Sequence, residues 1–540
     1  MNYFHTKMDA SLPQILSSAL AIFLIANALP AKAQDVPSQL SPGSPASRKS
    51  TSDAPKIIEE WLGVYLGNKK AGYSSSISSP TTYEGKPVTR EIGRGVTKLQ
   101  LLGTSVEEEE LTETISDLQF RPLYQKFDVK SNGSALHVEA KFDYLTRKIS
   151  CTIGEGADAT QKEIEIPKGA DLATDSNALT RGKPIAIGQK LSFFYLDPLS
   201  VELKEAHVEV TGKAAIKDDN GKFVSVFLTK SDLASGKMTS WSDAKGALYR
   251  GELSMGPISM VMTRESKAHA LDIAYIAPSL ALPKKGSEDT PVPPADFAVA
   301  TAITPDKTIE NPRKLHSLKV SIAGISNKKL ILSDERQIAS NILPGKKSGF
   351  SATYTLHDEV FDPANSLSLP IQQPGMELFL GKAAYLDTEN VEIKKTALEI
   401  RGDETNVYKV CVAIRNWVNR EMTPDPSIGV IRSATDVYGR RRGVCRDYAT
   451  LFTALARAAG VPTRLCAGIV YSQGKFYYHA WAECYIKKWV AFDPTLYLPS
   501  FETEYVDATH IKFAQGDVTG MLNVVSIVGQ LQIKVKEQTL

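Results

Sequence analysis

The sequence predicts a multidomain α+β protein, with an N-terminal antiparallel β meander followed by a C-terminal domain of helices and strands. Short alternating runs between turn residues fill about residues 61–264, which is typical of consecutive β-hairpins. After about residue 385, apolar residues recur at spacings of three and four, which predicts helices. A segment with four prolines, residues 283–294, separates the two patterns and indicates a domain boundary.

The first residues are typical of a cleaved export signal. A nearly continuous apolar run covers residues 15–29, and the small residues of Ala31-Lys32-Ala33 follow it. The run is short for a membrane span and has the length of a signal-peptide core. We therefore expect cleavage near Ala33-Gln34, export to the periplasm or the medium, and no stable membrane span after processing. An uncleaved membrane anchor is the alternative interpretation.

Composition shifts along the rest of the chain predict its division into domains. The Ser- and Pro-rich stretch after the signal peptide is expected to be a disordered tether. Strand-like runs return after the proline-rich segment and precede the helical region. The expected parts are a signal peptide at 1–33, a tether at 34–55, a β-rich domain at 56–282, a linker at 283–312, a small β-rich region at 313–384 and a C-terminal domain of helices and strands at 385–540.

The charge balance gives no reason to expect a strongly charged partner. The chain has 63 Lys and Arg against 61 Asp and Glu, a formal charge of +2, so nothing attracts it globally to nucleic acid. Its 8 histidines are scattered, and neither a metal-binding nor a phosphate-binding motif occurs. We therefore expect no nucleic-acid partner, no metal and no cofactor, while the oligomeric state stays open.

Cys445 stands where a helix is expected to begin. Apolar residues after it fall on one stripe, and Gly460 followed by Pro462 would end the helix. Free N–H groups and the positive end of the helix dipole stabilise a thiolate at such a position. In an oxidising compartment an odd total of 5 cysteines leaves at least one thiol unpaired. The alternative interpretation is that Cys445 is a small buried core residue.

Two strand-like runs after this helix carry His479 and Asp493. Alternation puts His479 and Trp481 on one face of the first run, and Asp493 ends the second. A thiol that attacks a carbonyl, an imidazole that transfers protons and a carboxylate that orients the imidazole together perform acyl transfer. Cys445, His479 and Asp493 are therefore the candidate catalytic residues. Trp481 is expected to wall the cleft.

The stretch from about residue 385 to 500 resembles the transglutaminase-like superfamily of papain-like thiol enzymes. The matching text is RRGVCRDYATLFTALARAAGVPTRLCAGIVY, FYYHAWAECYI and WVAFDPT, and VDATHIKFAQGD resembles a tail of bacterial members. The resemblance implies that Cys445 is the nucleophile, His479 its base and acid, and Asp493 the orienting group. His510, within the tail, could approach the site, although a core or surface position is the default. Residues 34–310 lie outside the resemblance.

A catalytic triad makes a definite demand on strand register. A two-residue loop at Lys487-Lys488 would place His479 and Asp493 on opposite faces of their hairpin. The triad therefore predicts an odd-length loop or a bulge near Lys487. Cys466 and Cys484 fall on neighbouring strands, but a disulfide between them also requires matched register and Cβ direction, so the sequence leaves this pairing open.

The leading functional hypothesis is an exported thiol enzyme that acts on peptide or protein amide bonds through a thioester. Water resolving the thioester would make it a peptidase or amidase, whereas a primary amine would make it a protein-glutamine transglutaminase. Hydrolysis is favoured, because crosslinking requires a dry path for the amine. The alternative from another class is a catalytically silent binding module of the cell envelope.

Overall fold

The fold is known from a computed structural model that describes residues 57–540 except 68, 102–103, 157–158, 175–184, 234–235, 245, 256–257, 279, 281–300, 346–348 and 496–505. The predicted signal peptide and tether, residues 1–33 and 34–55, lie outside the described residues, as does most of the predicted linker. Within the described part, no helix is both long and apolar enough to cross a membrane.

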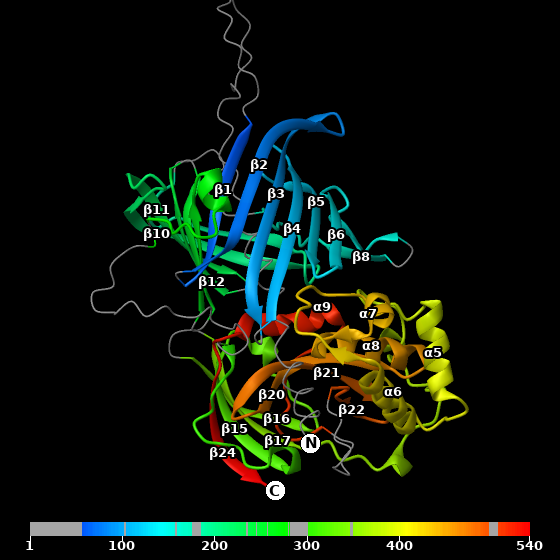
Figure 1. Cartoon of the computed structure of the whole chain (residues 1–540). Helices are drawn as coiled ribbons and strands as arrows, with labels where there is room; N and C mark the ends of the chain where they lie inside the picture. Colours follow the sequence, from blue (N-terminus) through cyan, green and yellow to red (C-terminus); the bar gives the residue numbers. More distant parts are fainter. Residues whose placement is uncertain are drawn as a thin grey trace, which may run out of the picture.

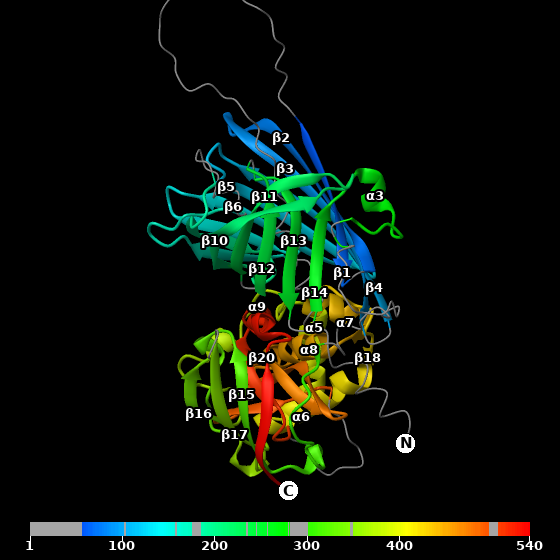
Figure 2. The same ribbon diagram turned by 90° about the vertical axis from the view of Figure 1, so that its left-hand side faces the viewer.

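Among the described residues of the N-terminal half, fourteen strands form one antiparallel sheet, in agreement with the predicted antiparallel β meander. Strands β1 to β8 pair with their neighbours in sequence, and so do strands β9 to β14. The pairing of β1 with β14 joins these two series into one sheet. Figures 1 and 2 show a strongly curved sheet that occupies one end of the molecule. The strands are β1 (Ile58–Leu66), β2 (Lys69–Tyr83), β3 (Lys86–Leu101), β4 (Thr104–Ser116), β5 (Pro122–Ser131), β6 (Ser134–Asp143), β7 (Lys148–Ile153), β8 (Thr160–Glu165), β9 (Lys190–Asp197), β10 (Glu202–Lys217), β11 (Phe223–Leu233), β12 (Gly236–Ser242), β13 (Leu248–Met255) and β14 (Ile258–Arg264).

Turn chemistry fixes the hairpins of this sheet. Asn132 and Gly133 join β5 to β6 with φ of 46° and 78°, the left-handed conformation that Asn and Gly adopt most easily in tight turns. Along β6, buried positions such as Leu136 and Val138 alternate with more exposed ones. On this strand one face is therefore packed and the other is more exposed.

The strand-rich region before the helices forms a four-stranded sheet whose fourth strand comes from the C-terminal end of the chain. Its sheet has the order β16-β17-β15-β24, so the C-terminal strand pairs with a strand more than two hundred residues earlier. Ile303 forms an isolated antiparallel bridge with Phe476, which fastens the segment before this sheet to the rest. The strands are β15 (Ser317–Ile325), β16 (Gln337–Pro344), β17 (Phe350–His357) and β24 (Gln532–Thr539).

The C-terminal part combines helices with a second four-stranded sheet of order β22-β21-β20-β23. The α+β class that the sequence predicts is confirmed. The helices are α3 (Lys267–Leu271), which follows β14, and α5 (Val391–Arg401), α6 (Val407–Glu421), α7 (Ala434–Arg440), α8 (Cys445–Ala458) and α9 (Val518–Met521); the strands are β18 (Thr423–Pro424), β19 (Arg442–Gly443), β20 (Thr463–Ser472), β21 (Lys475–Tyr485), β22 (Trp489–Phe492) and β23 (Ile511–Gly516).

Helix α8 is the centre of this part. Every residue from Cys445 to Arg457 is buried. The helix is therefore covered on all its faces and not only along the single apolar stripe that the sequence predicts. Helices α5, α6 and α7 pack against α8, and so do β20 and β21. Gly460, with φ of 93°, follows the helix end in the left-handed conformation that glycine favours. These surrounding helices and strands hold α8, and with it Cys445, in place.

The curved sheet rests directly on this helical part (Figures 1 and 2). Arg440 Nη2 donates to Gly133 O at 2.5 Å, and Lys204 Nζ donates to Asn523 Oδ1 at 2.9 Å. Buried apolar residues of both parts belong to one continuous core. A small space between them is lined by Glu108, Val129, Leu136, Leu199, Gly429, Val430 and Ile431.

Candidate active site

The residues around Cys445 build a tight helix start. The Val444 N–H donates to Asp447 Oδ2 at 2.9 Å, so Asp447 closes the first turn of α8 over the residue before the cysteine. The same carboxylate is 3.0 Å from Arg432 Nη2. A Cβ on Gly443 would lie 2.5 Å from Asp447 Oδ2, so only glycine fits there. This local arrangement places Cys445 as the first residue of α8.

The hairpin of β21 and β22 has the register that the triad requires. Tyr485 pairs with Trp489 and Ala482 with Phe492, so the loop has three residues, 486–488. Lys487 adopts a φ of 139° within it. Because paired residues share a face, Asp493 after Phe492 falls on the face of His479. The prediction of an odd-length loop is confirmed.

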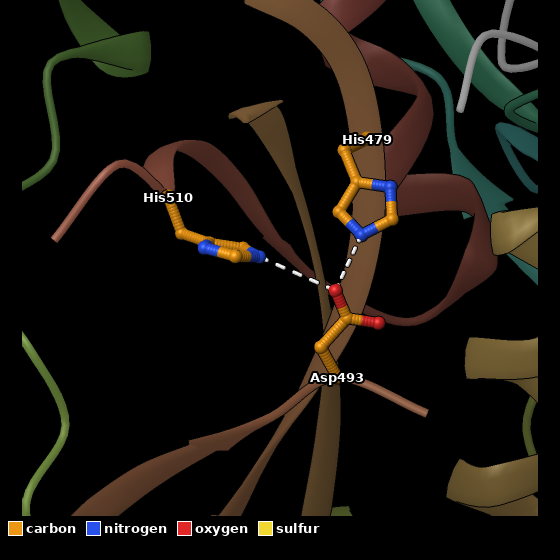
Figure 3. Close-up of side chains that lie close together, drawn as sticks. All are labelled: His479, Asp493 and His510. Carbon is orange, nitrogen blue, oxygen red and sulfur yellow. Dashed lines mark hydrogen bonds and ion pairs between the residues drawn. The ribbon is translucent and has the colours of Figure 1, made fainter. Parts of the chain in front are cut away.

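His479 and Asp493 meet through one short hydrogen bond. His479 Nε2 is 2.7 Å from Asp493 Oδ2, as Figure 3 shows. The other carboxylate oxygen, Oδ1, accepts from Thr495 N at 2.8 Å and from Thr495 Oγ1 at 2.7 Å. The imidazole is fully buried and the carboxylate is 2% exposed. The turn at residues 493–495 therefore aims the carboxylate at the imidazole.

Burial and charge act in opposite directions on these two groups. Burial alone would lower the pKa of His479, but the Asp493 carboxylate and, to a smaller extent, the Cys445 thiol raise this pKa to about 10. Burial alone would raise the pKa of Asp493, but His479 and His510 hold it well below its usual range. The pair is therefore an imidazolium and a carboxylate at neutral pH.

His479 has a second ring nitrogen available for chemistry. Its Nδ1 is buried and has no hydrogen-bond partner among the described residues. The Cys445 thiol lies close enough for its charge to raise the pKa of the imidazole. Nδ1 is thus the nitrogen through which a proton could pass between thiol and imidazole. Hydrogen bonds of this kind are often long in a site without substrate.

His510 also belongs to this site, although the sequence argument left it in a default core or surface position. Its Nε2 is 3.2 Å from Asp493 Oδ2, so two imidazoles approach one carboxylate oxygen (Figure 3). Its Nδ1 is 3.3 Å from Asp507 Oδ1. A sequence signal was present, because Asp507-Ala-Thr509-His510 repeats the Asp-x-Thr pattern of Asp493-Pro-Thr495.

Donor atoms of His479, Asp493 and His510 all lie within 4.8 Å of one another, a spacing that a metal ion could use. Each histidine Nε2 is already directed at the carboxylate, so hydrogen bonding accounts for the arrangement. The indole of Trp481 covers this group: its ring centroid is 6.1 Å from that of His479 and 5.4 Å from that of His510. Trp481 is itself fully buried, so it covers these side chains from within the fold and does not line an open cleft.

The structure also decides two points about the cysteines. Cys445 has an exposed fraction of 0%, so the site is not the open cleft that the expected role of Trp481 implies, and a peptide can reach Cys445 only if the site opens. Cys466 pairs with Trp481 while Cys484 pairs with Thr463 on the opposite face of the sheet, and both thiols are free. The pairing register of β20 and β21 excludes the Cys466–Cys484 disulfide.

Comparison with known proteins gives one domain-level match. Residues 394–494 match the model of the transglutaminase-like superfamily. A Haemophilus influenzae protein without an assigned function is 32% identical over 96 residues, which are 17% of this chain and 26% of that protein. The chain therefore spans about a quarter of the length of this relative.

Two crystal structures are similar at lower identity. One, from Cytophaga hutchinsonii and provisionally described as a cysteine protease, is 21% identical with a TM-score of 0.30 and covers 42% of this chain and 85% of its own. The other, a β-barrel-like protein of unknown function from Brucella abortus, is 13% identical with a TM-score of 0.29 and covers 39% and 95%. Residues 394–494, with Cys445, His479 and Asp493 among them, form a transglutaminase-like domain, the fold of a family of thiol enzymes.

Proposed function

We propose that this protein is an exported thiol enzyme that acts on peptide or protein amide bonds through Cys445, His479 and Asp493. The observation that carries the proposal is the buried hydrogen bond of 2.7 Å from His479 Nε2 to Asp493 Oδ2, combined with the action of Cys445 on the same imidazole. Binding alone has no need of a thiol, an imidazole and a carboxylate held in this order.

The proposed reaction starts from a thiolate and an imidazolium. The Cys445 sulfur attacks the amide carbonyl carbon, and the carbonyl oxygen becomes an oxyanion to which the Cys445 N–H at the start of α8 can donate. When the C–N bond breaks, the imidazolium of His479 gives its proton to the departing amine. A thioester on Cys445 remains, and His479 is neutral. Asp493 keeps the imidazole oriented throughout.

The second half of the reaction decides the class of product. Neutral His479 can take a proton from water, whose oxygen attacks the thioester carbonyl and releases an acid and the Cys445 thiolate. A primary amine in place of water would yield a new amide. We favour hydrolysis, because an exported enzyme meets water everywhere and transamidation requires its exclusion from the intermediate.

Mass spectrometry of products separates these outcomes. Glutamine-containing peptides are incubated with the purified protein, with and without a primary amine, and compared with Cys445→Ala. A matched control is Cys151→Ala, a buried cysteine of β7 far from the site in sequence. We expect cleaved or deamidated peptides that are abolished only by Cys445→Ala. Amine-linked products would establish a transglutaminase instead, and identical products from Cys445→Ala would refute the thiol mechanism.

We also propose that the chain is processed near Ala33-Gln34 during export. The support is the apolar run at residues 15–29 and the small residues that follow it. Mature protein recovered from the periplasm or medium should start at Gln34, and chains lacking residues 1–33 should keep full activity. A recovered chain that still begins at Met1 would contradict the cleavage.

A further inference from the structure

His510 lies between two carboxylates in the interior of the C-terminal part. Its Nε2 is 3.2 Å from Asp493 Oδ2, and its Nδ1 is 3.3 Å from Asp507 Oδ1. The imidazole is 0% exposed, and the two carboxylate residues are 2% and 4% exposed. Water therefore does not separate these charges, and each contact must be accounted for by protons on the ring itself.

Both carboxylates are held by local turns of the same kind. Thr509 donates to Asp507 Oδ1 from N at 2.8 Å and from Oγ1 at 2.5 Å, as Thr495 does for Asp493. Arg313 pairs with the other oxygen of Asp507. Burial alone would raise the pKa of Asp507, but Arg313 and His510 hold it well below its usual range. His510 thus stands between two anions.

Counting donors decides the state of the ring. A neutral imidazole has one N–H group and one bare nitrogen, so one of the two contacts would set a lone pair against a carboxylate oxygen. A doubly protonated imidazole turns both contacts into charge-assisted hydrogen bonds. We propose that His510 is a positioning residue of the reaction: a doubly protonated imidazole that bridges Asp493 and Asp507 and holds the Asp493 carboxylate against His479.

This role rests on the proposed function and adds a residue to it. Two donors on Asp493 Oδ2 fix where that oxygen lies, and the charge of His510 offsets part of the Asp493 charge that His479 feels. The two rings are 5.7 Å apart between centroids, near enough for such an effect. The charged or titratable groups that contact His510 or its carboxylate partners are Asp493, Asp507, His479, Arg313 and Arg336, whose Nη2 donates to His510 O.

The protonation state can be tested without any activity. We would record ¹⁵N spectra of the histidine rings in Cys445→Ala protein at pH 7, with His510→Gln and His316→Gln used to assign the signals. We expect both His510 nitrogens to carry protons, and Asp507→Asn to remove this signature. A bare ring nitrogen on His510 overturns the proposal. This outcome is independent of whether Cys445 is a nucleophile.

The positioning role requires kinetics of the intact protein. His510→Leu should lower kcat by about 10²-fold with little change in KM, the size expected when a catalytic group is misplaced. His510→Gln keeps a donor but loses the charge, so the alkaline limb of kcat against pH should move upward as His479 becomes harder to deprotonate. His316→Gln is the matched control, an exposed histidine whose Nδ1 is 2.5 Å from Asp358 Oδ2.

Three results would overturn the positioning role. The first is an unchanged pH profile in His510→Gln with equal loss of activity in both His510 variants, which is the behaviour of a merely structural residue. The second is wild-type kcat in His510→Leu. The third is activity that requires a divalent metal and is lost on chelation, because a metal would then explain the cluster. Circular dichroism of each variant confirms that it is folded.

Discussion

At the scale of single residues, burial and neighbouring groups have opposite effects on the charge of His479. Its ring is fully buried, which disfavours charge, yet its neighbours Asp493 and Cys445 favour the imidazolium. The effect of the neighbours is larger than that of burial, because the pKa of His479 rises to about 10. A charge that is favoured only in the folded protein must contribute to the stability of the fold.

A pH series on His479→Gln tests this contribution. Because the folded-state pKa is raised from 6.5 to about 10, the stabilisation by His479 is complete below about pH 6.5 and is lost as the pH rises through about 10. The unfolding free energy of the wild type should therefore exceed that of His479→Gln most at pH 6, with a gap that narrows by pH 10. His269→Gln, which loses a half-exposed His–Asp contact, is the control. A gap that widens with pH would contradict the ion pair.

The sequence identified the three candidate catalytic residues but not the place of His510 in the site. Cys445, His479 and Asp493 could be selected because their order and spacing match a motif, and the structure brings His479 and Asp493 into contact. His510, just before β23, could not be placed, because its contact with Asp493 depends on how two segments of the fold dock. The repeated Asp-x-Thr pattern indicates two similar turns but not that they meet.

At the scale of elements, the site depends on α8 and the β21–β22 hairpin. The start of α8 is fixed by Asp447 and by a glycine before it, while the hairpin loop fixes the face of Asp493. In the neighbouring pair of β20 and β23, a Cβ on Gly468 would lie 1.9 Å from Ile511 O, so β20 and β23 also approach as closely as glycine permits. Backbone geometry therefore positions the catalytic side chains.

Two alanine substitutions on α8 separate catalysis from packing. Cys445→Ala should abolish activity and change the unfolding free energy by less than about 1.5 kcal/mol, because only one sulfur atom is removed. Leu455→Ala, fully buried on the same helix, should cost about 2–5 kcal/mol through the cavity it leaves. Chemical denaturation and activity assays check both. Equal destabilisation would mean that Cys445 acts as a core residue.

The elements themselves could be read well from the sequence, with limits. The helix around Val410 and the strands on both sides of His479 follow from periodicity, and the register of the β21–β22 hairpin follows from requiring the triad. The full burial of α8 could not be foreseen, because its polar residues Asp447 and Arg446 are buried by partners distant in sequence.

At the scale of the whole molecule, the curved sheet reaches the helix that carries the nucleophile. Glu108 of β4 is 6% exposed and lies beside Gly429, and Arg446, the residue after Cys445, is near enough to act on its pKa. Its Oε1 has no hydrogen-bond partner among the described residues. Burial raises the pKa of Glu108 to about 8, although Arg446 opposes this. The sheet therefore reaches the start of α8 through a carboxyl group that burial keeps largely protonated at neutral pH.

Glu108→Gln should stabilise the protein in a pH-dependent way. In the wild type the folded-state pKa is raised from 4.5 to about 8, so stability is highest below about pH 4.5 and falls as the pH rises through about 8. Gln cannot ionise, so the variant should gain on the wild type steadily over this range. Glu109→Gln is the control, because Glu109 points outward and pairs with Arg94. A constant difference between the two proteins would contradict the buried carboxyl.

The sequence predicted the class of this assembly and missed the contact within it. Hairpin turns such as Asn132-Gly133 predict the meander, because each turn is determined by residues close together in the sequence. The run Glu107–Glu110 favours an exposed strand or turn, and nothing in it shows that Glu108 would be buried beside Gly429. Contacts between distant segments depend on how the parts dock, which composition and periodicity do not encode.

The central claim is that Cys445 and His479 act as a thiolate–imidazolium pair. It is tested most directly by the rate of Cys445 alkylation with iodoacetamide in the folded protein from pH 5 to 9, measured by peptide mass spectrometry in the wild type and His479→Ala. We predict that wild-type alkylation persists below pH 7, where an ordinary thiol with a pKa of about 8.5 reacts slowly, and that His479→Ala abolishes this acid-side reactivity. Alkylation that rises only through pH 8–9 and is the same in both proteins would contradict the pair.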